Sequence, residues 1–189
     1  KCSKPIDYEA SPCLCPDCTR HEKSFERARS PFSYEGLVKD GIYSFKYYNK
    51  PYFYKLFGSC LIRFMKKNDY TDFDYITSVP LHRSKMRTRG YNQSELLAKH
   101  LCEELHIPYV DSLKRTKKTI RQSQQSKEDR RENLKGAFAI KSPRKNEMIK
   151  KSRVLLVDDV YTTGSTADEC AKTLLNFGVS KVYVITIAR

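Results

Sequence analysis

The sequence predicts an α/β fold in which helices flank a parallel sheet. Residues 154–157 form a short, unbroken apolar run, which is typical of a parallel strand buried on both faces. Residues 74–79 and 181–187 are expected to form two further buried strands, and apolar residues at helical spacing follow the first two strands. A chain of 189 residues is long enough for one such domain with an appendage.

The strand at 154–157 is predicted to end at Asp158 and Asp159, and a short loop and a helix follow. The helix is indicated by apolar residues that share one face, namely Ala167, Ala171, Leu174 and Leu175. Gly178 comes directly after this periodic stretch, where glycine often ends a helix. In open α/β sheets, ligands bind at the carboxyl ends of the strands, so this loop lies where a binding site is expected.

The loop has the composition of a phosphate site. Gly164 lets the backbone approach an anion closely, and the amides of the following helix N-terminus favour negative charge. Four side chains add hydroxyl groups beside these amides: Thr162, Thr163, Ser165 and Thr166. The segment lacks the lysine of a GxxxxGK[ST] loop and the chain has no GxGxxG run, which argues against ATPase and dinucleotide-binding functions.

Asp158 and Asp159 would repel a phosphate that they faced directly. A few ångströms away, they can accept hydrogen bonds from a ribose diol or hold the water shell of Mg²⁺. The alternative is purely structural, with Asp159 capping a helix and Asp158 solvated at the strand end.

The strand at 74–79 is followed by a cationic loop that we expect to extend through Arg89, and then by a helix. Leu97, Leu101 and Leu105 share one face of that helix. The basic side chains of the loop cannot all be buried without partners, so they are expected to face solvent or an anion. They are Arg83, Lys85, Arg87 and Arg89. His82 lies among them, but a lone histidine in a basic loop is more often a hydrogen-bonding group than a catalyst.

The N-terminal head carries four of the seven cysteines within 18 residues. Cys15 and Cys18 have the CxxC spacing of half a tetrahedral zinc site, and Cys2 can supply a third thiolate. Such a closed site would be structural. Unliganded thiols or adventitious disulfides are the alternative. The other cysteines occupy helical patterns and are expected to be reduced residues of the core: Cys60, Cys102 and Cys170.

Four segments together resemble the ComF competence family, which has the type I phosphoribosyltransferase fold. Residues 154–166 are similar to the phosphoribosyl-pyrophosphate signature of that fold, and residues 79–93 are similar to the family's central motif. A third segment matches through Gln122, Arg130, Arg131, Asn133 and residues 136–138, and the cysteine-bearing head matches as well. The resemblance covers nearly the whole chain.

The resemblance implies a zinc-knuckle head over residues 1–24 and a phosphoribosyltransferase-like domain over residues 25–189. Residues 110–140 correspond to a flexible hood that closes over the site, with lid contacts from Gln122, Arg131 and Asn133. The turn at residues 81–83 resembles the pyrophosphate loop, so Arg83 and Lys85 are expected to contact the anion. In the family pattern a CxxC pair opens the head and Cys2 matches its second cysteine. The fourth zinc ligand would then come from a cysteine before residue 1, from Cys13 or from His21.

The formal net charge of +14 makes an anionic partner plausible and a nucleic acid worth testing. A basic surface can also serve solubility alone. Between residues 114 and 135, nine basic and three acidic residues give a net charge of +6, which indicates a mobile basic arm. The candidate nucleic-acid contacts are Arg87, Arg89, Lys117, Lys118 and Arg121.

Aromatic residues are frequent between residues 25 and 67 and alternate with lysines. Such a pattern can stack single-stranded bases, but helical spacing in part of it is more typical of a core. We favour the core for the spaced set: Phe57, Cys60, Leu61 and Phe64. The stretch at 47–54 stays open as a base-stacking candidate.

The sequence supports two candidate functions. The preferred one, implied by the resemblance, is a factor of natural competence that handles incoming single-stranded DNA in the cytoplasm. The resemblance also implies a phosphoribosyl-pyrophosphate site with Mg²⁺ and contacts with other proteins of the competence machinery. The alternative is an active phosphoribosyltransferase acting on an unidentified nitrogenous base. Purine salvage is disfavoured because purine enzymes of this fold have an aspartate at the position of Thr162.

No apolar run approaches 18 residues and no signal-peptide pattern is present, so we expect a soluble chain without a membrane span.

Overall fold

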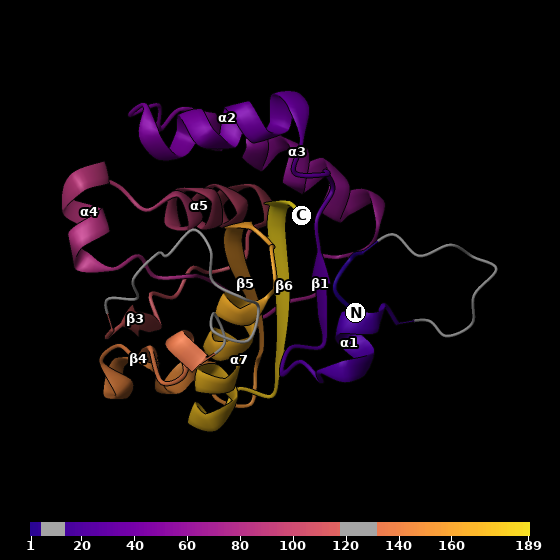
Figure 1. Ribbon diagram of the computed structural model, residues 1–189. Helices are drawn as coiled ribbons and strands as arrows, with labels where there is room; N and C mark the ends of the chain where they lie inside the picture. Colours follow the sequence, from indigo (N-terminus) through magenta and orange to yellow (C-terminus); the bar gives the residue numbers. More distant parts are fainter. Residues whose placement is uncertain (5–13, 118–131) are drawn as a thin grey trace.

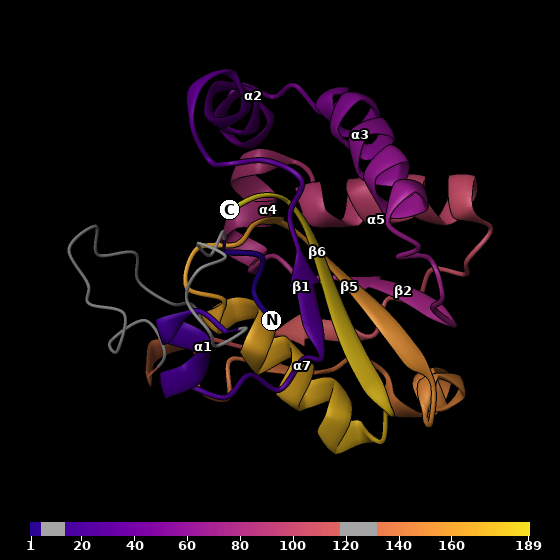
Figure 2. The same ribbon diagram turned by 90° about the vertical axis from the view of Figure 1, so that its right-hand side faces the viewer.

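The computed structural model describes residues 1–4, 14–117 and 132–189. A four-stranded sheet forms its centre, with the strand order β1–β6–β5–β2 (Figure 2). All neighbouring strands in it are parallel. The strands are β1 (Arg27–Arg29), β2 (Tyr75–Ser78), β5 (Arg153–Val160) and β6 (Lys181–Ala188). The predicted α/β architecture with a parallel sheet is therefore confirmed.

Helices cover both faces of this sheet (Figures 1 and 2). One face packs against α2 (Gly36–Tyr47), α3 (Phe53–Lys67) and α5 (Gln93–Leu105). The other face packs against α7 (Ser165–Phe177), the hood and the head, which includes α1 (Pro16–Arg20). The two central strands are buried on both sides, which explains why their sequences are apolar runs rather than alternating patterns.

Two local predictions were wrong. β5 continues through both aspartates to Val160, because it keeps its parallel pairing with β6 as far as Ala188. The basic segment after β2 is a helix, α4 (Arg83–Arg89), rather than a loop. Between the hood and β5 lies a 3₁₀ helix, η1 (Pro143–Ile149), and its buried Ile149 side chain packs against the core.

The hood begins and ends in a small antiparallel hairpin of β3 (Leu113–Arg115) and β4 (Phe138–Ile140). Its base is attached to α7, because the Gly136 amide donates a hydrogen bond to Glu169 Oε1 over 2.6 Å. Lys118, Arg121, Gln122 and Arg131 lie outside the described residues.

The favoured core assignment of the aromatic segment is confirmed for α3. Phe57 and Leu61 are buried in one core cluster, and Phe64 is half-buried against it. Cys60 is half-buried. Among the described residues, no helix is both long enough and apolar enough to cross a bilayer.

Candidate sugar-phosphate site

The end of β5, the loop after it and the start of α7 surround a small hollow that opens to solvent. It lies at the carboxyl edge of the sheet, where ligands of such folds bind. Its lining residues are Asp158, Val160, Tyr161, Thr162, Gly164, Ser165, Thr166, Ala167 and Thr186. Five of the nine predicted sugar-phosphate residues are therefore brought together here, and Thr186, from the neighbouring strand β6, is an addition that the loop motif does not contain.

The loop is held in its conformation by its own hydrogen bonds. The hydroxyl groups of Thr163 and Ser165 lie 2.8 Å apart, and Thr163 Oγ1 accepts a hydrogen bond from the Ser165 amide. Gly164 has a φ of +73°, and a Cβ atom there would lie 2.1 Å from the Tyr161 hydroxyl oxygen. Glycine is required at this position by conformation and by space, and the loop presents amides and hydroxyls at the first turn of a 13-residue helix.

The Asp158 carboxylate faces this hollow and is held by two donors. Asp158 Oδ1 accepts hydrogen bonds from Ser94 Oγ and from the Asp159 amide, both over 2.9 Å. Burial, followed by the charge of Asp159, raises the pKa of Asp158 to about 7. This carboxyl group therefore changes its charge near neutral pH.

Asp159 is placed differently. It does not line the hollow, and its Oδ1 atom pairs with Lys46 Nζ at the end of α2, 2.8 Å away. Both side chains are largely buried, with exposed fractions of 13% for Lys46 and 14% for Asp159. The sequence analysis missed Lys46, because a lysine more than 100 residues from its partner leaves no local pattern.

Residues 91–94, at the corner between α4 and α5, connect α2 to the site through hydrogen bonds. Tyr91 Oη and Gln93 Nε2 both donate to the Phe45 carbonyl, at 2.6 and 3.1 Å, and so cap the last turn of α2. Asn92 Nδ2 donates to the Val79 carbonyl at the end of β2. Ser94, one residue beyond the motif recognised in the sequence, continues this corner to Asp158.

The predicted anion contacts Arg83 and Lys85 lie on α4, outside the lining of the hollow, and Arg83 is exposed. His82 caps this helix: its Nδ1 atom accepts a hydrogen bond from the Ser84 amide over 3.2 Å. This structural role agrees with the expectation that His82 is a hydrogen-bonding group rather than a catalyst.

The candidate nucleic-acid contacts are spread over two elements. Arg87 and Arg89 belong to α4, and the Arg89 guanidinium lies 5.4 Å from the ring centre of Tyr47. Lys117 is exposed after β3, where its amine donates to the Lys135 carbonyl over 2.9 Å. Asn133, the lid residue that the structure describes, is exposed.

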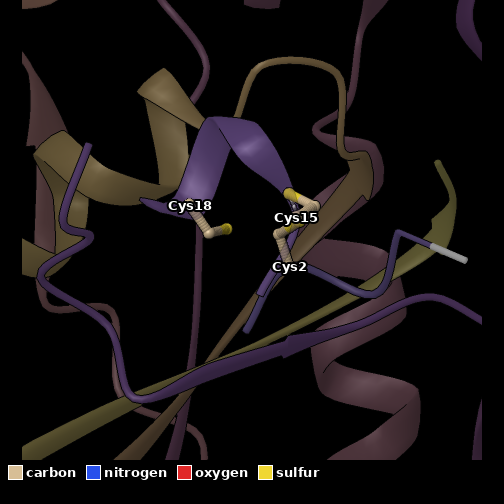
Figure 3. Close-up of side chains that lie close together, drawn as sticks. All are labelled: Cys2, Cys15 and Cys18. Carbon is tan, nitrogen blue, oxygen red and sulfur yellow. Dashed lines mark hydrogen bonds between the residues drawn. The ribbon is translucent and has the colours of Figure 1, made fainter. Parts of the chain in front are cut away.

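The head brings three cysteine side chains together at the surface of the core (Figure 3). The sulfur atoms of Cys2, Cys15 and Cys18 all lie within 4.8 Å of one another, and all three residues are buried. Thiolates bound to one zinc ion at about 2.3 Å have comparable separations, so this group fits a metal. Cys13 lies outside the described residues, and His21 is exposed and not part of the group.

The described cysteines are all free thiols, so none of them forms the disulfide considered as an alternative. Burial opposes charge on Cys2, but hydrogen bonds from Arg189 and from the Lys4 amide outweigh it and lower the pKa of Cys2 to about 7. The Arg189 guanidinium also lies 5.2 Å from the ring centre of Tyr161, which lines the hollow. The cysteine group and the phosphate loop thus share one supporting contact.

Comparisons with known proteins agree with this geometry. The model of the phosphoribosyl transferase domain matches residues 92–189. Competence protein F of Haemophilus influenzae is 35% identical over 193 aligned positions, which include the whole of this chain and 82% of that protein. DNA utilization protein YhgH of Escherichia coli O157:H7 is 39% identical over 117 residues, 61% of this chain and 49% of that protein, so the match spans about half of that relative.

Among solved structures, the allosteric regulatory enzyme of purine biosynthesis matches with a TM-score of 0.45 and 21% identity, over 69% of this chain and 25% of that one. Membership of a family is shown by the domain match and by competence protein F, whose alignment includes the whole of this chain. Competence protein ComFC of Bacillus subtilis, 28% identical over 94% of this chain and 71% of that protein, extends the same group. The chain belongs to the ComF family and has the type I phosphoribosyltransferase fold.

Proposed function

We propose that this chain serves natural competence by handling incoming single-stranded DNA in the cytoplasm, and that its hollow binds phosphoribosyl pyrophosphate or a similar sugar phosphate. The observation that carries the second part is the meeting of Asp158 with the hydroxyl-rich loop around one hollow. A phosphate needs the amides and hydroxyls of the loop, and a ribose diol needs a nearby carboxylate acceptor.

Each part of the ligand has a partner of suitable chemistry. The 5′ phosphate is assigned to the loop from Thr162 to Thr166, and the ribose diol to the two aspartates. Mg²⁺ would enter with the ligand and balance pyrophosphate charge, its water shell held by the carboxylates. Arg83 and Lys85 on α4 are assigned to pyrophosphate, and Gln122, Arg131 and Asn133 to closure of the hood.

The DNA part is supported by the names of the relatives and by the charge of the chain. One relative is a competence protein and another is a DNA utilization protein. A formal net charge of +14 favours a polyanionic partner. Arg87, Arg89, Lys117, Lys118 and Arg121 are the candidate phosphate contacts, and other competence proteins are candidate partners.

The head is assigned a structural zinc ion on Cys2, Cys15 and Cys18, with Cys13 as the fourth ligand. The zinc would cross-link Cys2 to residues 15–18 and would have no open coordination position for chemistry.

The experiment measures both ligands on the same protein. Binding of phosphoribosyl pyrophosphate with Mg²⁺ is followed by calorimetry, and binding of a labelled oligothymidylate by fluorescence anisotropy at low and high salt. The Asp158→Asn/Asp159→Asn variant should lose the sugar phosphate and keep the DNA. DNA affinity that is indifferent to salt, or sugar-phosphate affinity that survives the double substitution, would contradict the proposal.

The match to the phosphoribosyl transferase domain model favours a second candidate, transfer of the phosphoribosyl group to an unidentified nitrogenous base. Positioning and electrostatic stabilisation would supply most of that catalysis. Release of pyrophosphate that depends on one particular base would select this candidate.

A further inference from the structure

Exposed aromatic and apolar side chains are concentrated on one part of the described surface. Nine large side chains of this kind are exposed among the described residues, and seven of them lie between Leu37 and Met86. They include Tyr43, Tyr47, Tyr48 and Tyr52, whose exposed fractions are 49%, 47%, 63% and 58%. Such a concentration marks an interaction surface rather than chance exposure of single residues.

Three of these tyrosines form one group at the end of α2, here called the tyrosine cluster: Tyr43, Tyr47 and Tyr48. The ring centre of Tyr43 lies 4.7 Å from that of Tyr47 and 5.7 Å from that of Tyr48, with interplanar angles of 42° and 68°. Tilted rings do not cover one another's faces as stacked rings do. About half or more of each of these residues is exposed, so part of each ring can contact a planar partner.

The cluster belongs to α2, which lies beyond the carboxyl ends of β5 and β6 (Figure 1). Contacts of its neighbouring residues hold the end of this helix in place. Phe45 is fully buried beneath it, and its carbonyl accepts hydrogen bonds from Tyr91 and Gln93. Lys46, between the tyrosines in sequence, is tied to Asp159. A helix end that is already fixed in place loses little conformational entropy when it binds a partner.

The chain segments that carry the cluster and α4 are basic over long stretches. Residues 41–68 and 75–94 contain ten Lys or Arg and no Asp or Glu. The helix α2 contains one acidic side chain, Asp40. The Arg89 guanidinium lies over Tyr47, and the exposed Arg83 and Arg87 extend this basic surface along α4.

We propose that the tyrosine cluster stacks the bases of single-stranded nucleic acid while Arg87 and Arg89 of α4 bind its phosphates. The partner and its contacts with Arg87 and Arg89 rest on the function proposed above, and the assignment of base stacking to the tyrosine cluster goes beyond it. Aromatic rings beside cations match the alternation of bases and phosphates in a single strand. A duplex would not fit, because its bases are stacked on one another and cannot reach the rings.

The test compares four proteins for binding of a labelled oligothymidylate of about 20 nucleotides, at about 50 mM and about 200 mM salt. The first two are the wild type and the triple variant Tyr43→Ala/Tyr47→Ala/Tyr48→Ala. The third is the matched triple Tyr→Phe variant, which keeps the rings, and the fourth is Met148→Ala, an exposed residue elsewhere. Calorimetric binding of phosphoribosyl pyrophosphate and the melting temperature check that each variant is folded.

The alanine variant should bind the oligonucleotide about 10-fold more weakly for each ring that stacks a base, with an unchanged salt slope. The phenylalanine variant and Met148→Ala should stay within about twofold of the wild type, since the ring faces persist. A fifth protein, Arg87→Ala, should bind the oligonucleotide more weakly and show a salt slope reduced by about 0.7 for each phosphate that the protein no longer neutralises.

Three results would overturn this location. Unchanged affinity in the alanine variant would refute the surface and leave the proposed DNA role standing. Polyglutamate competing as well as the oligonucleotide would indicate a site for acidic proteins. A wild-type protein that binds the sugar phosphate but no oligonucleotide would refute the DNA role and this surface together.

Discussion

Lys46 Nζ and Asp159 Oδ1 form a 2.8 Å ion pair that joins the end of α2 to the end of β5. Both side chains are nearly enclosed, so the pair is screened little by solvent. Asp159 is one of the two carboxylates assigned to the ribose. Any ligand that uses this carboxylate must share it with Lys46 or displace Lys46.

Removal of Lys46 should therefore cost stability. Lys46→Met keeps the apolar stem but leaves Asp159 nearly buried without its cation, and we expect a loss of about 2–3 kcal/mol in the free energy of unfolding. Urea denaturation of wild type and variant measures this loss in the free energy of unfolding. The Lys46→Met/Asp159→Asn protein should recover most of the loss, because no unpaired charge remains. Losses that simply add would show that the pair contributes no coupling.

Sugar-phosphate binding should depend on pH through Asp158. Its pKa of about 7 means that the carboxylate, the form that accepts hydrogen bonds from a diol, forms as the pH rises from 6 to 8. We expect affinity to increase by about 10-fold over that interval. Titrations of wild type and Asp158→Asn with the same ligand separate this effect from ionisation of the ligand. An identical pH dependence in both would rule Asp158 out as the cause.

The same carboxyl group should affect stability in the opposite sense. Its folded-state pKa lies above the ordinary value of 3.8, so its stabilising contribution is complete below about pH 4 and is lost as the pH rises through 7. Asp158→Asn should therefore melt at a higher temperature than wild type at pH 8, with a smaller difference at pH 5. Thermal melts at the two pH values provide the measurement.

Gly164→Ala should damage the phosphate loop more than a comparable change elsewhere. Gly90 is the matched control, because its φ of +79° is nearly that of Gly164 but a Cβ atom there meets nothing within 4 Å. Gly90→Ala should cost about 1 kcal/mol of stability from backbone strain alone. Gly164→Ala adds a clash with Tyr161 and should also abolish sugar-phosphate binding. Equal effects of the two substitutions would mean that space at the loop is unimportant.

The cysteine group should bind one zinc ion per chain. A strong chelator should lower the melting temperature by about 5 °C or more, since metal binding contributes to folding free energy. Cys15→Ser should abolish the bound zinc measured by elemental analysis. Cys60→Ser, a half-buried cysteine of α3 outside the group, should retain it. Full zinc content in Cys15→Ser would refute the assignment.

Local sequence determined a large part of this protein. The apolar run of β5, the hydroxyl loop, the glycine at its turn and the face of α7 all follow from short-range patterns, because burial periodicity and turn conformation depend on neighbouring residues. The parallel sheet follows from the alternation of these units. The family follows too, since its motifs occur in order along the chain.

Tertiary structure alone decided which distant residues complete the site. Lys46, Ser94 and Thr186 come from α2, α5 and β6, and the interactions that place them at the carboxylates act across more than 25 residues of chain. The pairing between β5 and β6 likewise extended the strand past both aspartates, against their low strand propensity. Charge and burial at a site depend on neighbours in space, and a linear pattern contains no record of them.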